Sequence, residues 1–550
     1  MLLNFKLQAD QRPWFLSSLA IAACISLPIF AVFYLALFPD ENAWPHLFNT
    51  VLPSYLKNTI ILMLGVGSLT LIIGIGTAWL IAMYDFPGKK YFSWALLLPF
   101  SVPAYVIAYT YTDFLEYAGP VQNALRALFG WSSAQDYWFP EIRSMGGAIM
   151  MMSLVLYPYI YMLARAAFLE QSVSLYRISR SLGAGPIQFF FRVSLPIARP
   201  AIAVGLSLVL METLNDFGTV DYFAVRTLTA GLYDTWLNMG NIGGAAQIAL
   251  LMVAVVVILI SLERYSRRKQ KQFHPRGQGD PIKSVKLSGL KAVIAFLCAF
   301  IPVLFGFIVP FTLLSFYAVQ YFDTSWTDSF FTYALNSFSL AAAASVITLL
   351  LGIVLAYTNR LNKNKATQFL VNFSSLGYAV PGTVLAIGII IPFAAFDNLV
   401  DGAMREYFQF SSGLILSGTA FAIIFSYSVR FLAVSSGAIE SSLGKVTPNM
   451  DMASRSLGYS HFQTLIKVHL PIIKRGALTG MLVVFVDCLK ELPATLILRP
   501  FNFETLATQV YQFASDELLE QSALSALVIV IVGIVPVMLL DKSINKKGIN

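Results

Sequence analysis

The sequence is poor in charged residues. Asp, Glu, Lys and Arg make up 12% of its 550 residues, whereas hydrophobic residues make up 57%, and the mean hydropathy is +0.70. Ordinary soluble domains carry about 25% charged residues. Apolar runs such as Thr59–Met83 and Ala523–Leu540 approach or exceed the roughly 20 residues that a helix needs to cross a bilayer. The composition therefore predicts an all-α integral membrane protein that crosses the lipid bilayer many times.

Motifs of catalysis and cofactor binding are also missing. No Gly-x4-Gly-Lys-Ser/Thr occurs, so the chain has no loop that would cradle the phosphates of ATP. His-Glu-x-x-His and Ser/His/Asp clusters are absent too. Cys24, Cys298 and Cys488 lie singly in apolar runs and form no Cys-x-x-Cys pair. We expect neither an enzyme activity nor a cofactor in this chain, and no firm set of metal ligands.

The net charge is +8, but the bases lie in short loops between apolar runs. This pattern indicates membrane topology rather than nucleic-acid binding, because basic loops stay in the cytoplasm. The linker around Arg267–Lys286 and the carboxy-terminal tail are basic, whereas segments 318–335 and 504–521 contain acids and no base. Both termini are predicted to be cytoplasmic. The first apolar run is interpreted as a retained span and not a signal peptide.

About twelve transmembrane helices fit the apolar runs. They divide into two tandem sets of six, with the same orientation in both sets because each begins and ends inside. The predicted spans are 13–37, 56–84, 93–115, 144–168, 198–222 and 243–262, followed by 290–317, 336–358, 366–397, 411–437, 475–499 and 522–541.

A sequence repeat supports this division. Ser-Arg-Ser-Leu-Gly occurs at Ser179–Gly183 and again at Ser454–Gly458. Nine residues separate each glycine from Val-Ser-Leu-Pro-Ile in the first copy and from Val-His-Leu-Pro-Ile in the second. We predict a first half at 1–262, a basic linker at 263–289 and a second half at 290–550, related by a pseudo-two-fold axis along the membrane normal.

Each repeated block is polar between apolar flanks, so we expect it to lie on the water side of the membrane. The pattern predicts one helical stretch, a glycine turn, a second stretch and a Leu-Pro stop. Such an elbow would hold a short helix crosswise beneath the membrane, exposed to a cytoplasmic partner. The alternative is an ordinary amphipathic elbow at the lipid surface.

The pattern Gly-x9-Val-x-Leu-Pro resembles the signature of permease subunits of binding-protein-dependent ABC importers. The resemblance implies the fold of the type I importer permeases and a place in a bacterial inner membrane. It also implies two copies of a cytoplasmic ATP-binding subunit that carry ATP and Mg, and a periplasmic substrate-binding protein. The family's Glu-Ala-Ala is replaced here by Arg177-Ile178-Ser179 and Met452-Ala453-Ser454. The implied ATPase-coupling residues lie in loops at about 170–200 and 438–475: Ser179, Arg180, Gly183, Leu195, Pro196, Ala453, Ser454, Arg455, Gly458, Leu470 and Pro471.

Carboxylates in the fifth span of each half are candidates for a translocation path. Glu212 and Asp216 are four residues apart, as are Asp487 and Glu491, so each pair is predicted to share one helix face. Carboxylates in a membrane span are unfavourable unless paired or hydrated. The two faces would line one conduit for a hard cation. The alternative is local pairing, for example of Lys490 with Asp487 or Glu491.

The segments Asp216–Phe223 and Lys490–Leu496, with Arg499-Pro500-Phe501, are similar to fused ferric-iron importer permeases. That resemblance implies import of Fe³⁺ handed over by a periplasmic binding protein, by alternating access. Fused permeases for thiamine or phosphonates are the alternatives. A different class is a secondary transporter driven by an ion gradient, with Asp216 and Glu491 as coupling carboxylates, and a third is a passive channel.

Overall fold

The computed structural model describes residues 11–39, 42–171, 173–267, 285–362, 364–444 and 446–546. Most of the basic linker and the end of the basic tail lie outside the described residues. The first half contains α1 Arg12–Leu37, α2 Trp44–Asn49, α3 Leu52–Met83, α4 Lys89–Ala95, α5 Ala104–Leu115, α6 Pro120–Phe129, α7 Met145–Leu169, α8 Val173–Ser181, α9 Pro186–Phe189, α10 Leu195–Asn215, α11 Gly218–Tyr222, α12 Leu228–Tyr233 and α13 Ile242–Arg267.

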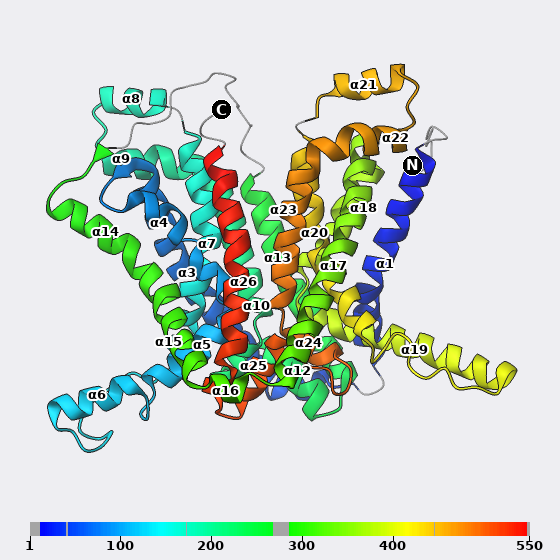
Figure 1. Ribbon diagram of the computed structural model, residues 1–550, viewed down its shortest axis with the longest axis horizontal. Coiled ribbons are helices and arrows are strands. Elements are labelled where there is room, and N and C mark those ends of the chain that lie inside the picture. Colours follow the sequence, from blue (N-terminus) through cyan, green and yellow to red (C-terminus); the bar gives the residue numbers. More distant parts are fainter. Residues whose placement is uncertain are drawn as a thin grey trace. The chain divides into compact units, whose positions relative to one another are not determined.

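The second half is likewise built of helices (Figure 1). They are α14 Leu290–Val303, α15 Val309–Gln320, α16 Phe322–Ser325, α17 Asp328–Leu361, α18 Lys365–Ser374, α19 Gly382–Phe408, α20 Ala420–Leu443, α21 Pro448–Ser456, α22 His461–Thr464, α23 Leu470–Leu489, α24 Pro493–Leu498, α25 Leu506–Ser515 and α26 Leu519–Lys546. Two short strands, β1 Tyr84–Asp85 and β2 Val285–Lys286, pair in parallel.

Among the described residues, ten helical segments are long and apolar enough to cross a membrane, or eleven if one bent pair counts as a span. The predicted fifth span of the second half is not among them. There, α23 is 20 residues long and carries Lys474, Arg475 and Asp487, so it is not apolar enough to be counted. The bent pair replaces the straight span predicted at 93–115: its two parts meet at 90°, and α5 begins directly after Pro103. Likewise α19 begins directly after Pro381.

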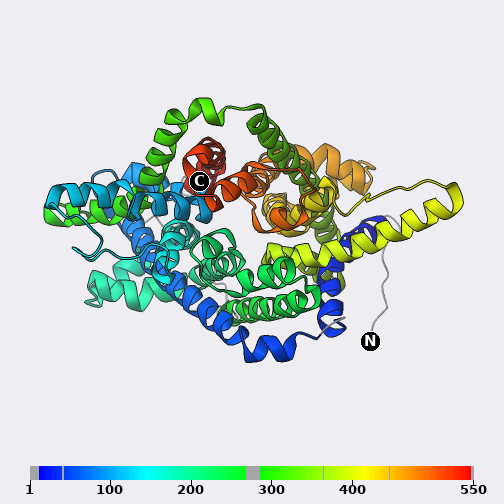
Figure 2. The same cartoon turned by 90° about the horizontal axis from the view of Figure 1, so that it is seen from below.

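The chain folds into two compact units that do not coincide with the sequence halves. The first unit comprises Met1–Trp44, Thr235–Leu250 and Asp328–Thr508. Its centre is the packed triplet α17, α20 and α23, and α1 from the other half of the sequence packs on α17, α18 and α19. The contact of α1 is close: a Cβ on Gly388 would lie 2.2 Å from the carbonyl oxygen of Pro28. The carboxy-terminal part of α19, in yellow, projects away from its unit (Figures 1 and 2).

The second unit comprises Pro45–Asp234, Leu251–Thr327 and Gln509–Asn550. Its central triplet is α3, α7 and α10. Helices α15 and α26, which come from the second half of the sequence, pack against each other and against helices of the first half. A Cβ on Gly306 would lie 2.8 Å from the carbonyl oxygen of Leu154, and one on Gly533 would lie 2.9 Å from that of Ser101. Each unit therefore combines the core of one half with terminal helices of the other.

Within each unit the same hydrogen bonds recur at equivalent positions. The amide of Leu228 donates to Thr59 Oγ1 at 3.0 Å, and the amide of Leu506, its counterpart in the second half, donates to Ser337 Oγ at 2.8 Å. The side-chain amide of Asn58 donates to the carbonyl of Arg226, and that of Asn336 donates to the carbonyl of Glu504. The repeat in the sequence is therefore a repeat of tertiary contacts.

Candidate functional site

The repeated polar block of the first half forms an elbow, residues 173–197. Helix α8 ends at a left-handed glycine, Gly183, with φ of 82°. The amide of Gly183 donates to the carbonyl of Arg180, and the amide of Ala184 donates to that of Ser179, both at 3.0 Å. These two bonds are the Schellman arrangement that ends helices at a glycine. The chain then reverses into α9 and the π-helical turn Phe190–Ser194.

The second elbow, residues 448–472, repeats this geometry. Gly458 also has φ of 82°, and its amide donates to the carbonyl of Arg455 at 3.0 Å. The amide of Tyr459 donates to the carbonyl of Ser454 at 3.2 Å. Helix α22 and the π-helical turn Leu465–His469 follow. The prediction that each glycine makes a turn between two short helices is confirmed in both elbows.

The predicted Leu-Pro stop is wrong. Leu195-Pro196 and Leu470-Pro471 begin the long helices α10 and α23 instead of ending a helix. A proline lacks the amide that would bond the preceding turn. The widened π-helical turn before each proline accommodates it, since the amide of Leu195 bonds Phe190 and that of Leu470 bonds Leu465, five residues back.

Exposed apolar side chains occupy equivalent positions on the two elbows. Leu182, Ile187 and Phe191 are 81%, 75% and 61% exposed, and their counterparts on the second elbow are Leu457, Phe462 and Ile466, at 75%, 59% and 44%. Arg180 and Arg455 are exposed as well, as is Ala453. Apolar groups that stay exposed at matching places are typical of a surface that another molecule covers.

The remaining predicted coupling residues support the elbows from within. Ser179 and Ser454 are buried, and the hydroxyl of Ser454 bonds that of Thr464 at 2.7 Å. Leu195, Pro196 and Leu470 are half-buried at the start of their helices. The exposed arginines and apolar residues therefore form the outer surface, while the two serines lie buried beneath it.

Aromatic packing attaches the first elbow to its unit. Phe189 is fully buried and packs on Tyr176, with ring centroids 5.1 Å apart. Trp79 from α3 contacts Phe168 from α7 at 5.2 Å and Phe190 at 4.9 Å. Two hydrogen bonds join Gln171 and Ser194 at 3.0 and 2.7 Å.

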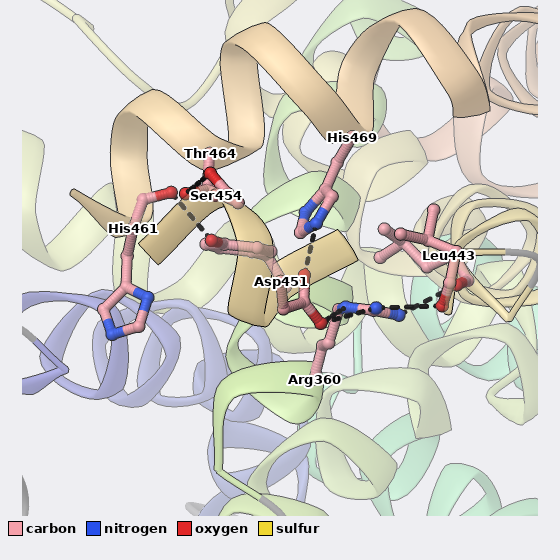
Figure 3. Close-up of polar contacts among 9 residues, drawn as sticks. Arg360, Leu443, Asp451, Ser454, His461, Thr464 and His469 are labelled. Atoms are coloured by element: carbon pink, nitrogen blue, oxygen red, sulfur yellow. Dashed lines mark hydrogen bonds and ion pairs between the residues drawn. The ribbon is translucent and has the colours of Figure 1, made fainter. Parts of the chain in front are cut away.

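Charged groups attach the second elbow. In Figure 3, Arg360 from α17 and His469 converge on Asp451 of α21. Arg360 Nη2 lies 2.7 Å from Asp451 Oδ2, and His469 Nε2 lies 2.6 Å from Asp451 Oδ1. Burial lowers the pKa of His469, and Asp451 partly opposes this shift. Sequence reasoning missed these three residues, although the unequal pairs Tyr176/Asp451 and Ser194/His469 in the repeat were a usable signal.

The second carboxylate of each predicted pair binds the beginning of a short helix. Asp216 Oδ1 accepts from the amides of Thr219 and Val220 at 3.0 and 3.2 Å. Glu491, at the equivalent position in the second half, accepts from the amides of Ala494 and Thr495 at 3.0 and 3.1 Å. The prediction that each pair shares one continuous helix face is wrong, because α10 ends at Asn215 and α23 at Leu489.

Local pairing neutralises charge in the second half. Lys490 Nζ lies 2.8 Å from Asp487 Oδ1, which confirms the pairing alternative for this residue. Glu491 is buried and accepts a bond from Arg430 Nη1 at 2.8 Å. In the first half Glu212 lies half-buried in the last turn of α10. Among the described residues, no group of three or more His, Cys, Asp or Glu side chains is arranged to hold a metal ion.

Comparison with known proteins identifies a family whose model matches both halves of the chain. The family model described as binding-protein-dependent transport system inner membrane component matches residues 70–272 and 348–548, which contain both elbows. The Fe(3+)-transport system permease protein FbpB 2 of Haemophilus influenzae is 26% identical over 90% of this chain and 91% of its own length. The ferric transport system permease protein FbpB of Actinobacillus pleuropneumoniae is 25% identical over 73% and 58%. The molybdenum transport system permease protein ModB of Escherichia coli is 27% identical over 36% and 84%.

Proposed function

This chain belongs to the family of binding-protein-dependent transport system inner membrane components and is a multi-pass permease of an ABC importer, and we propose that its cargo is Fe³⁺. The observation that carries this proposal is the likeness to a relative named as an Fe(3+)-transport permease, which spans 90% of the chain. The likeness to a molybdenum permease spans only 36%. Thiamine and phosphonates remain the alternative cargoes.

The elbows are the proposed docking surfaces for two ATP-binding subunits, one at each elbow. Both elbows present an exposed leucine directly before the left-handed glycine, Leu182 and Leu457, with an arginine two residues earlier. A Cβ on either glycine would meet no atom of the described residues within 4 Å. The space beside each turn is therefore open to a partner. ATP and Mg belong to that partner in this proposal.

Transport would proceed by alternating access. ATP binding in the partner subunits moves the elbows, and the long helices that begin at Leu195 and Leu470 carry this movement into the membrane. A periplasmic binding protein delivers the ion on the opposite side, with both termini of this chain in the cytoplasm. This orientation is supported by the basic linker and the acidic segments 318–335 and 504–521.

A conduit lined by Glu212, Asp216, Asp487 and Glu491 remains a prediction. Asp487 and Glu491 have basic partners within their own unit, in Lys490 and Arg430. We therefore assign the larger share of any cation attraction to Glu212 and Asp216. Uptake that falls in Asp216→Asn but not in Asp487→Asn would support this assignment, and the reverse order would contradict it.

The cargo is tested by reconstituting this chain in liposomes with the ATPase subunit and the binding protein encoded beside it. We expect ATP-dependent accumulation of radioactive Fe³⁺ and none of thiamine or a phosphonate. Accumulation of another cargo would refute the iron assignment alone. Uptake by the isolated chain, driven by a proton or sodium gradient, would refute the assignment to an ATP-driven importer.

Docking is tested in the same system by adding charge to the elbows. In Leu182→Glu with Leu457→Glu, we expect the ATPase subunit to be lost on purification, because the carboxylates would have to be desolvated in the interface. Leu128→Glu is the matched control, since Leu128 is 76% exposed on α6 and belongs to neither elbow. Retention of the ATPase by the double variant would show that these leucines do not dock it.

A further inference from the structure

We propose that Arg360, Asp451 and His469 form a positioning network that makes the second elbow a rigid link between the ATPase and the membrane helices. The proposal rests on the docking function proposed above for the elbows. None of the three residues is kept at the equivalent position of the first half, and their contacts all lie within the first compact unit.

The network joins three segments at one carboxylate. Asp451 lies on α21, whose outer residues face the partner, and both of its oxygens are engaged. Oδ2 accepts from Arg360 Nε at 3.1 Å and from Nη2 at 2.7 Å, while Oδ1 is 2.6 Å from His469 Nε2. Arg360 comes from the last turn of α17, and His469 is the residue directly before α23. Movement of α21 is thereby tied to two long helices.

Arg360 also holds the end of a third long helix. Its Nη1 donates to the carbonyl of Leu443, the last residue of α20, and its Nη2 donates to the carbonyl of Val446, both at 2.9 Å. A cation at the carboxyl end of a helix is favoured by the helix dipole. Only the planar fork of a guanidinium can serve the carboxylate and two carbonyls together, so lysine cannot replace this residue fully. Figure 3 shows the bonds to Asp451 and Leu443.

The network is partly sheltered from solvent, most completely at His469. The side chains of Arg360, Asp451 and His469 are 17%, 35% and 1% exposed. Charge-assisted hydrogen bonds in such surroundings are stronger and more directional than those at an open surface. Since Asp451 can only accept when ionised, His469 donates from Nε2. Its Nδ1 is buried and has no hydrogen-bond partner in the described part of the chain.

The first elbow shows that the fold of an elbow does not require this network. At the equivalent positions it has Ala82, Tyr176 and Ser194, yet its glycine has the same φ and the same pair of capping bonds. Aromatic packing, which is less directional, takes the place of the charges. The charges are therefore not needed to shape an elbow. Rigid coupling of α21 to the long helices accounts for their presence in the second elbow.

The test measures coupling in the reconstituted importer, as ATP hydrolysed per ion transported. We expect Arg360→Met to raise this ratio by roughly threefold or more while the complex still assembles, and Arg360→Lys to give an intermediate value because one charged bond remains. Arg405→Met, which removes the ion pair of Arg405 with Asp401 within α19 and outside both elbows, is the matched control and should leave the ratio near that of the unmodified protein. An unchanged ratio in Arg360→Met would overturn the proposal.

A second measurement needs no partner. In the purified chain, Arg360→Met should speed backbone hydrogen exchange in α21 by roughly tenfold and leave exchange in α8 unchanged. The reason is that the variant lacks the charged hydrogen bonds that oppose local opening of α21. Equal exchange in α21 with and without Arg360 would also overturn the proposal. Failure of the unmodified chain to bind the ATPase is a separate result: it would remove the docking function, and the exchange experiment would still report on the network.

Discussion

The two elbows have the same backbone and different attachments. Gly183 and Gly458 share φ of 82° and the same capping bonds, and the exposed leucines beside them match. Beneath this surface, Phe189 of the first elbow is replaced by Thr464, Tyr176 by Asp451 and Ser194 by His469. The exposed arginine, leucine and glycine are the same in both copies, whereas the residues that attach each elbow to the protein's own helices differ. The comparison therefore separates the proposed docking surface from its attachment.

The carboxylates that follow α10 and α23 show the same contrast between a shared backbone arrangement and different partners. Asp216 and Glu491 each accept two backbone amides at the start of a short helix. Only Glu491 has a buried arginine beside it, because Arg430 is replaced by Val155 at the equivalent position in the first half. Both halves therefore keep the bonds between the carboxylate and the helix amides. Only the second half has an arginine partner that is distant in the sequence.

The largest expected effect comes from breaking this buried pair. Arg430→Met leaves the charge of Glu491 buried without its partner, which should lower the free energy of unfolding by about 3–5 kcal/mol. Thermal unfolding in detergent, followed by loss of helical signal, would measure it. The double variant Arg430→Met with Glu491→Gln should recover most of the loss, since the uncompensated charge is gone. A double variant as unstable as the single one would contradict this account.

The next effect is a difference between the two elbows in how much stability their attachments supply. Phe189→Ala removes a fully buried ring from the aromatic cluster and should destabilise the second unit by about 3–5 kcal/mol. At the equivalent position, Thr464→Ala removes one hydroxyl bond to Ser454 and should lower stability by only about 1 kcal/mol. Unfolding of the two variants side by side tests the difference. Equal losses would show that the first elbow does not depend on aromatic packing.

The smallest expected effect is a pH dependence confined to the second elbow. Because burial lowers the pKa of His469 in the folded chain, the unfolded chain binds a proton more readily. The stability from neutral His469 is therefore complete above the unfolded pKa of about 6.5 and is lost progressively as the pH falls below it. Asp451 and Arg360 are the charged groups facing the ring, and Tyr357 packs against it.

Hydrogen exchange at pH 7.5 and pH 5.5 would detect this effect. Exchange in α21 should accelerate at the lower pH, once corrected for its intrinsic pH dependence, whereas exchange in α8 should not. His469→Gln should abolish the difference. An equal response of both elbows would mean that another group titrates.

Local features of the elbows could be predicted from the sequence. The position of each glycine turn and of each short helix depends on residues within one turn of the chain, so the repeated motif carries the information. The Leu-Pro pair misled the prediction because proline can begin a helix as readily as it ends one. Pro196 and Pro471 lie at helix starts because a π-helical turn precedes each of them, and no local sequence pattern predicted those turns.

The sequence by itself determined the class of the protein, because hydropathy, the scarcity of charge and a motif that occurs once in each half are properties of composition and order. Only the tertiary structure decided that α1 packs with the core of the second half and that α15 and α26 pack with the core of the first. It also decided that Arg360 meets Asp451 and that Arg430 meets Glu491, although each pair is far apart along the chain. Apolar helices have many partners that bury them equally well, so their pairing is set by close packing and by a few polar contacts between distant segments.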